Sequence, residues 1–395
     1  MTRAAITYRR LNPSERTLLG PDLSNASPRA RQGLIAGLQG AADPEFLGVL
    51  EHARELLRDL WRTDNDDTFI FPGSEEAGLE AVLVNLVEPS DVVAVGVIGQ
   101  AGERLAEAAT RVGADVVRVE APWGSPLEPA ALAQALEERR PRLVALVHGD
   151  ASTGILQPLC ELTKQAHDAG ALVAADLAST TAIVDVDVEE LGVDAAWAGS
   201  QKGLSAYPGL ALVTFGRDAV ARVERRRTPV ASWYFELDGL RSFKREDRRH
   251  QTLPAPLVYA LVEVLELAYE QRMEYRESRH RNRQAALIAA LEELGLRVRA
   301  SAEHRLPSVT VVEVPAGVDG ERIRTDLRRL YRLDVGTGLG RWASEVWRIG
   351  LQSHSAQPGY IAQLVSALEV LLGESGYDVP RSGAAVRRAL EALDP

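Results

Sequence analysis

The chain has 395 residues and a formal net charge of −11 at pH 7, with 46% hydrophobic and 26% charged residues. This is enough for one large core and a second, smaller one. An acidic chain is a poor candidate for binding nucleic acid or anionic membranes, and its basic clusters, Arg225–Arg227 and Lys244–His250, are short and lie among acidic residues. The single cysteine, Cys160, excludes a disulfide framework and a cysteine zinc cluster, and we expect no metal site.

The sequence shows neither the apolar core of a signal peptide nor a run of about 18 apolar residues. We therefore expect no membrane partner and predict a cytoplasmic enzyme.

Residues 1–25 are rich in turn formers and are predicted to form an N-terminal arm. Short apolar runs then alternate with amphipathic stretches from about residue 65 to residue 215, which predicts an α/β fold with a mainly parallel sheet covered by helices on both faces. The expected strands are Thr68–Phe71, Val92–Val97, Val116–Glu120, Leu143–Gly149, Leu172–Ala178 and Leu210–Phe215.

A long helix is predicted from Pro256 to Leu294, because its apolar residues recur at helical spacing. Beyond it, strand-like runs at 306–314 and 346–351 alternate with helix-like ones, which indicates a smaller α+β domain. We expect residues 26–265 to form the large domain and residues 266–395 the small one.

Unusual residues follow the strands at their carboxyl ends, where such sheets carry their active sites. Asp176 ends one strand, and Lys202 follows 26 residues later, a spacing that we interpret as one strand–helix–strand excursion. Asp176 alone is more often a helix cap, and Lys202 alone is more often a surface residue. Together they suit a pyridoxal phosphate site, in which the lysine forms a Schiff base with the aldehyde and the carboxylate keeps the ring nitrogen protonated.

Three motifs, "HGDASTGILQPL", "VAADLAST" and "AGSQKGLSAYPG", carry a resemblance to a known family. They resemble the class V aminotransferases, in the alanine–glyoxylate and serine–pyruvate branch, and "GPDLSN", "RRHQTLPAPLVYAL" and "VWRIGL" extend the likeness along nearly the whole chain. The resemblance implies a fold-type I pyridoxal-phosphate enzyme with a seven-stranded sheet, acting as a homodimer on a small amino acid and a 2-oxo acid. "SAQPGYIAQLVSAL" is similar to pyridoxamine–pyruvate aminotransferase, a relative that uses the unphosphorylated vitamer.

The resemblance also implies site residues. Lys202 and Asp176 are the implied catalytic pair. The implied cofactor-binding residues are Ser74, Glu75, Glu76, Ala101, Ser152, Asp176, Ala178, Ser200, Gln201, Lys202, Arg249 and Thr252, the last of these from the partner subunit. Asn25, Ser152 and Arg348 are the implied substrate-binding residues, with Arg348 holding the α-carboxylate through its planar fork.

The sequence departs from the family pattern at the expected phosphate loop, at the ring-stacking position and in "GPDLSN". Glu75 and Glu76 stand where glycine is usual, and our preferred interpretation is a plain helix start with both side chains turned to solvent. The alternative places one glutamate in the phosphate pocket, where it selects an unphosphorylated vitamer. Ala101 or Gln100 stands where the family stacks an aromatic residue on the ring, Arg249 stands for a common tyrosine, and Asp22 for a usual glycine.

Two other hypotheses compete with an aminotransferase. A lyase or desulfurase on the same fold is weakly supported, because the only candidate nucleophile is Cys160 at a helix start. A non-catalytic domain is disfavoured, because Asp176, Lys202 and Arg348 are all present.

Overall fold

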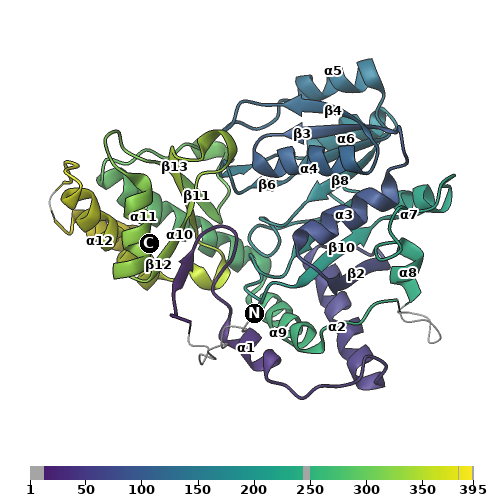
Figure 1. Ribbon diagram of the computed structural model, residues 1–395, viewed down its shortest axis with the longest axis horizontal. Helices are drawn as coiled ribbons and strands as arrows, with labels where there is room; N and C mark the ends of the chain where they lie inside the picture. Colours follow the sequence, from purple (N-terminus) through teal and green to yellow (C-terminus); the bar gives the residue numbers. More distant parts are fainter. Residues whose placement is uncertain (1–12, 243–249, 381, 394–395) are drawn as a thin grey trace, which may run out of the picture.

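The computed structural model describes residues 13–242, 250–380 and 382–393. Two large sheets organise this part of the chain, one of seven strands and one of four, with a two-stranded ribbon, β6 (Gly149–Asp150) and β7 (Ile155–Leu156), beside them (Figure 1). Among these residues no helix combines the length and the apolar content needed to cross a bilayer.

The seven-stranded sheet confirms the predicted α/β fold. Its strands, in order across the sheet, are β2 (Asp67–Pro72), β10 (Leu210–Phe215), β9 (Ala195–Gly199), β8 (Leu172–Asp176), β5 (Leu143–Val147), β3 (Val92–Val97) and β4 (Asp115–Glu120). All neighbours pair in parallel except β10, which runs antiparallel to both β2 and β9.

Helices cover both faces of this sheet, because its strands carry apolar residues on both sides. In β10, Leu210 and Leu212 enter one core, whereas Ala211, Val213 and Phe215 enter the other. The first core includes α2 (Pro44–Leu60), α5 (Pro129–Arg139), α6 (Cys160–Asp168) and α9 (Ala255–Gln271), and the second includes α3 (Glu75–Leu86), α4 (Gln100–Arg111), α7 (Arg217–Glu224) and α8 (Leu237–Arg241).

The predicted helix between the strands of Asp176 and Lys202 is wrong. Residues 177–194 connect β8 to β9 through turns, bends and irregular segments, with no helix. This stretch is rich in β-branched residues and aspartate, which have low helix propensity. The two strand ends are still neighbours, because β8 and β9 pair in parallel with Asp176 opposite Trp197.

The four-stranded sheet has the order β1 (Thr17–Leu19), β12 (Leu333–Thr337), β13 (Val346–Gly350), β11 (Val309–Glu313). It packs with α10 (Met273–Glu293), α11 (Gly320–Leu330), α12 (Pro358–Glu374) and α13 (Ala384–Leu393) in a core of its own. The N-terminal arm therefore contributes a strand to this sheet, and α1 (Pro28–Leu34), which follows it, packs against α9.

The single helix predicted over Pro256–Leu294 is two helices. The chain breaks at Arg272, whose φ of +59° lies in the left-handed region, and this ends α9 and starts α10. The domain boundaries at residues 25 and 265 stay a prediction.

Candidate active site

A cavity of about 380 Å³ opens at the carboxyl ends of the central strands. Lys202, Asp176 and Arg348, which are far apart in the sequence, all line it. The other lining residues are Asp22, Glu75, Glu76, Leu79, Gln100, Ala101, Arg104, Gly149, Asp150, Ala151, Ser152, Ser179, Trp197, Gln201 and Leu339. Five charged residues of this lining, Asp176, Lys202, Arg348, Glu75 and Glu76, are among the site residues predicted from the sequence.

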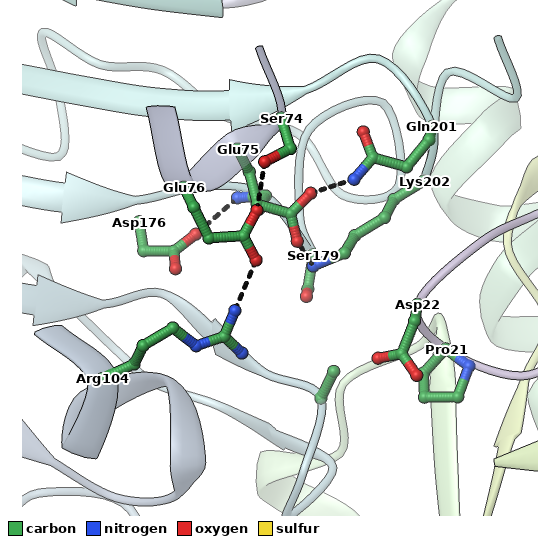
Figure 2. Close-up of polar contacts among 12 residues, drawn as sticks. Pro21, Asp22, Ser74, Glu75, Glu76, Arg104, Asp176, Ser179, Gln201 and Lys202 are labelled. Carbon is green, nitrogen blue, oxygen red and sulfur yellow. Dashed lines mark hydrogen bonds and ion pairs between the residues drawn. The ribbon is translucent and has the colours of Figure 1, made fainter. Parts of the chain in front are cut away.

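Lys202 lies in the loop after β9 and forms an ion pair with Glu75. Its Nζ is 2.7 Å from Oε1 of Glu75, and the two side chains are only 10% and 13% exposed. Gln201 donates a hydrogen bond from Nε2 to the other oxygen of Glu75 (Figure 2). Burial alone would lower the pKa of Lys202, but the carboxylates of Glu75 and Asp176 outweigh it and raise that pKa above its ordinary value. The lysine is therefore an ammonium group paired with Glu75.

Asp176 is the last residue of β8, and its Oδ1 accepts a hydrogen bond from the backbone N–H of Ala178 at 2.8 Å. Burial raises the pKa of Asp176 to about 6, while the positive charge of Lys202 acts in the opposite direction. Burial therefore favours the protonated form of this carboxyl. A cationic ring nitrogen beside it would favour the carboxylate.

Glu75 and Glu76 occupy the first turn of α3, directly after Gly73 and Ser74. The expectation that both glutamates turn to solvent is wrong for Glu75, which points toward Lys202 and Gln201 (Figure 2). Glu76 accepts hydrogen bonds from Ser74 Oγ and from Arg104 Nη1, each at 2.5 Å. Burial alone would raise the pKa of Glu76, but the Ser74 hydroxyl and the Arg104 charge are among the contacts that lower it. Attraction to Lys202 draws the Glu75 carboxylate away from bulk water, whereas the side chain of Glu76 is 45% exposed.

Ser152 and Asp150 form a second polar corner of the cavity. The Ser152 hydroxyl donates to Asp150 Oδ1 at 2.5 Å and accepts from the backbone N–H of Gln100 at 2.8 Å. Asp150 Oδ2 also accepts from the backbone N–H of Ala101, at 3.1 Å. This network fixes the start of α4, so that Gln100 and Ala101 line the cavity.

Arg348 lies on β13, between β11 and β12, with a side chain that is only 3% exposed. Its Nε donates to the carbonyl of Thr337 at 2.6 Å, and its Nη1 to the carbonyl of Ala151 at 3.3 Å. Its two terminal nitrogens face the carboxylate of Asp22 at 3.4 and 3.2 Å. The fork is therefore oriented toward the cavity, as a carboxylate-binding residue requires.

Five predicted site residues that the structure describes do not line the cavity. Ser74 is the N-cap residue of α3, and the backbone N–H of Ala178 donates a hydrogen bond to Asp176. Ser200 donates its hydroxyl to the Tyr207 carbonyl, and the side chain of Asn25 is bonded to Leu18 and Ser355. Thr252 is exposed, which leaves it available to a second subunit. Arg249 lies outside the described residues.

Sequence reasoning missed Arg104, Asp150, Ser179, Trp197 and Leu339 as lining residues. Arg104 had a usable signal, because it follows Ala101 by three positions on α4 and shares its helix face. Cys160 begins α6 and does not line the cavity, so the desulfurase alternative gains no support.

The lining residues fit the aldehyde and the ring of pyridoxal phosphate better than its phosphate group. Lys202 and Asp176 suit the aldehyde and the ring nitrogen, and the buried Oε1 of Gln201 has no hydrogen-bond partner in the described chain. At the expected phosphate end, however, Glu75 and Glu76 hold Gln201, Ser74 and Arg104. Over the whole cavity wall, carboxylates outnumber cationic groups by two. A phosphate dianion does not fit this arrangement unless Glu75 turns away.

Comparisons with known proteins identify the family of this chain. The family model described as aminotransferase class V matches residues 39–340. The (S)-ureidoglycine–glyoxylate transaminase of Bacillus subtilis is 32% identical, and the match covers 96% of this chain and 95% of that protein. The crystal structure of ureidoglycine–glyoxylate aminotransferase from the same organism has a TM-score of 0.95 and covers 98% of this chain and 100% of that one.

Two further solved structures show the same fold. The alanine–glyoxylate aminotransferase from Nostoc sp. is 38% identical, with a TM-score of 0.91 over 93% of this chain and 98% of that one. The pyridoxamine–pyruvate aminotransferase from Mesorhizobium loti is 25% identical, with a TM-score of 0.90 over 96% of this chain and 98% of that one. The family model and these relatives together show that this chain is an enzyme of the class V aminotransferase family, with a fold-type I architecture.

Proposed function

We propose that this aminotransferase moves an amino group from a small amino acid, of the alanine or serine type, to glyoxylate or pyruvate, with pyridoxal 5′-phosphate as cofactor at Lys202. The observation that carries the proposal is that Lys202 and Asp176 face one cavity from neighbouring strand ends. Relatives named for alanine–glyoxylate and ureidoglycine–glyoxylate transamination support glyoxylate as the acceptor. The cytoplasmic location stays a prediction.

When bound, the cofactor supplies an aldehyde and an electron-withdrawing ring, which stabilise negative charge at the substrate Cα. Asp176 holds the proton of the ring nitrogen, because an ionised carboxylate is favoured beside a cationic ring. Lys202, once released from Glu75, is the base that takes the proton from the substrate Cα. Arg348 binds the substrate carboxylate and so positions the Cα–H bond toward the lysine.

The proposal includes a homodimer with both sites at the interface. Thr252 is exposed and does not line the cavity of its own subunit, which supports a role toward a second subunit. Arg249 is proposed to act with Thr252 near the phosphate, where a cation would offset the charge of Glu75 and Glu76.

Lys202→Ala tests the proposed function. The variant should fold like the wild type by circular dichroism, lose transamination of alanine with glyoxylate, and gain no cofactor mass after borohydride reduction. Lys164→Ala is a matched control, because Lys164 is 75% exposed and pairs only with Asp168. Near-wild-type turnover by Lys202→Ala refutes the assignment of this lysine.

A second candidate function uses the unphosphorylated vitamer, so that pyridoxamine is the amino donor and pyruvate the acceptor. The inward position of Glu75 is the observation that favours it. The neutral hydroxymethyl group of pyridoxal or pyridoxamine can donate a hydrogen bond to a carboxylate, whereas a phosphate dianion is repelled by it. Titration of the apo-protein with pyridoxal and with pyridoxal phosphate distinguishes the candidates, because only the second one predicts a preference for pyridoxal.

A further inference from the structure

Asp22 occupies the fork of the arginine that we assign to the substrate carboxylate. Its two carboxylate oxygens lie 3.4 and 3.2 Å from Nη1 and Nη2 of Arg348. Because the other contacts of this guanidinium are the carbonyls of Thr337 and Ala151, all three of its nitrogens already have acceptors within the chain. An incoming carboxylate therefore meets a fork that a carboxylate of the same chain already faces.

The pair is asymmetric in exposure. The Asp22 side chain is 71% exposed, whereas that of Arg348 is 3% exposed. The contacts are long for a charged hydrogen bond, for which about 2.7–2.9 Å is usual. A ligand can therefore displace the Asp22 carboxylate from the fork at low cost, because water already solvates most of it.

The backbone around Asp22 keeps the carboxylate in reach even after such a displacement. The carbonyl of Pro21 accepts from Gln352 Nε2 at 2.8 Å. On the other side, the N–H of Ser24 donates to the carbonyl of Gln201 at 3.1 Å, and its hydroxyl lies 3.0 Å from the carbonyl of Lys202. The loop of Asp22 is thus tied to the lysine loop and to the segment after β13. Asp22 and Lys202 line the same cavity (Figure 2), so a substrate held there would lie beside this carboxylate.

We propose that Asp22 is a specificity-determining residue that selects substrates with an N–H donor close to the carboxylate, in an amide, ureido or second amino group. A substrate carboxylate without such a donor shares the Arg348 guanidinium with the like charge of Asp22, and the repulsion weakens its binding. A substrate with such a donor gives the displaced Asp22 a hydrogen-bond partner. This hydrogen bond offsets the binding free energy that is lost because the substrate carboxylate and Asp22 share Arg348. This inference rests on the proposed role of Arg348 in carboxylate binding.

A matched pair of ligands tests the selection. N-carbamoylglycine and 4-oxopentanoate have the same arrangement of heavy atoms, but the first carries N–H groups where the second carries methyl and methylene groups. Neither has an α-amino or α-oxo group, so calorimetric titration reports binding without turnover. The wild type should bind N-carbamoylglycine about fivefold more tightly than 4-oxopentanoate, the range of one exposed charged contact.

Asp22→Gly should abolish the preference: 4-oxopentanoate should bind more tightly than to the wild type, whereas the affinity for N-carbamoylglycine should change little. Asp22→Asn, which removes the charge and keeps the size, should tighten 4-oxopentanoate as well. Asp378→Asn is the control, because Asp378 is exposed and does not line the cavity. Equal shifts of both ligands in Asp22→Gly overturn the proposal. If instead Arg348→Ala leaves both affinities unchanged, it is the proposed role of Arg348 that fails.

Discussion

Removal of the Glu75 carboxylate should switch which form of the cofactor this protein prefers. In Glu75→Gln, Lys202 loses a partner at 2.7 Å, and the end of the cavity expected to hold phosphate loses one negative charge. Two unit charges 4 Å apart interact by about 4 kcal/mol at an effective dielectric of ~20, and a phosphate carries nearly two. The wild type can avoid that repulsion by breaking the contacts of Glu75 with Lys202 and Gln201, which costs about 2–3 kcal/mol for a pair this enclosed.

The wild type takes the less costly of these two routes, which is to break the contacts of Glu75. That cost of about 2–3 kcal/mol is therefore the binding free energy that Glu75→Gln should gain for pyridoxal phosphate. Pyridoxal phosphate should therefore bind Glu75→Gln roughly 30- to 150-fold more tightly than the wild type, while the affinity for pyridoxal changes little. The pKa of Lys202 should also fall, so that borohydride traps either vitamer at lower pH than in the wild type.

The assay is an absorbance titration of the apo-proteins with both vitamers, followed by mass measurement after reduction. Glu80→Gln is the matched control, because Glu80 is an exposed glutamate on the same helix that does not line the cavity. If the wild type binds pyridoxal phosphate as tightly as Glu75→Gln does, Glu75 does not oppose phosphate and the reasoning is refuted.

Three further predictions follow from the site. Asp176→Asn should abolish most transamination yet stabilise the apo-protein above pH 6. The folded-state pKa of Asp176 is raised from 3.8 to about 6, so wild-type stability falls by about 3 kcal/mol as the pH rises from 4 through 6, and urea denaturation of both proteins at pH 4 and pH 7.5 measures this difference. Arg348→Ala should raise the KM for amino and oxo acids by roughly 30-fold or more, from the loss of about 2–4 kcal/mol of bidentate binding, and steady-state kinetics that show an unchanged KM place the carboxylate elsewhere. Thr252→Ala should weaken pyridoxal phosphate binding without dissociating a dimer in light scattering, whereas an active monomer contradicts the interface site.

The sequence predicted the strands of the main sheet because most of them are short, apolar and β-branched. Strand β9 was not among the predicted runs, since Ala195–Gly199 reads AAWAG and contains no β-branched residue. Burial on both faces, between β8 and β10, stabilises these residues as a strand in spite of their propensity. The break at Arg272 was also missed, because the apolar residues on both sides continue at helical spacing.

The position of the site was predictable, and the direction of its side chains was not. Asp176 and Lys202 follow strands, so topology alone brings them to one edge of the sheet. Whether Glu75 faces solvent or Lys202 depends on a rotamer and on charges brought in by another strand, neither of which has a periodic signal. The pairing of Asp22 with Arg348 joins residues 326 positions apart and could not be read from either motif.

One electrostatic rule connects these departures from the family pattern. Each cationic side chain on the described cavity wall is paired with a carboxylate of the same chain: Lys202 with Glu75, Arg104 with Glu76, and Arg348 with Asp22. The three cationic side chains are therefore neutralised by carboxylates of the same chain, which reduces the repulsion among them. Every anionic group of a cofactor or substrate must instead compete with an internal carboxylate. Such a site binds plain anions weakly and favours ligands that offer the displaced carboxylate a donor, and this holds at the cofactor end as it does at the substrate end.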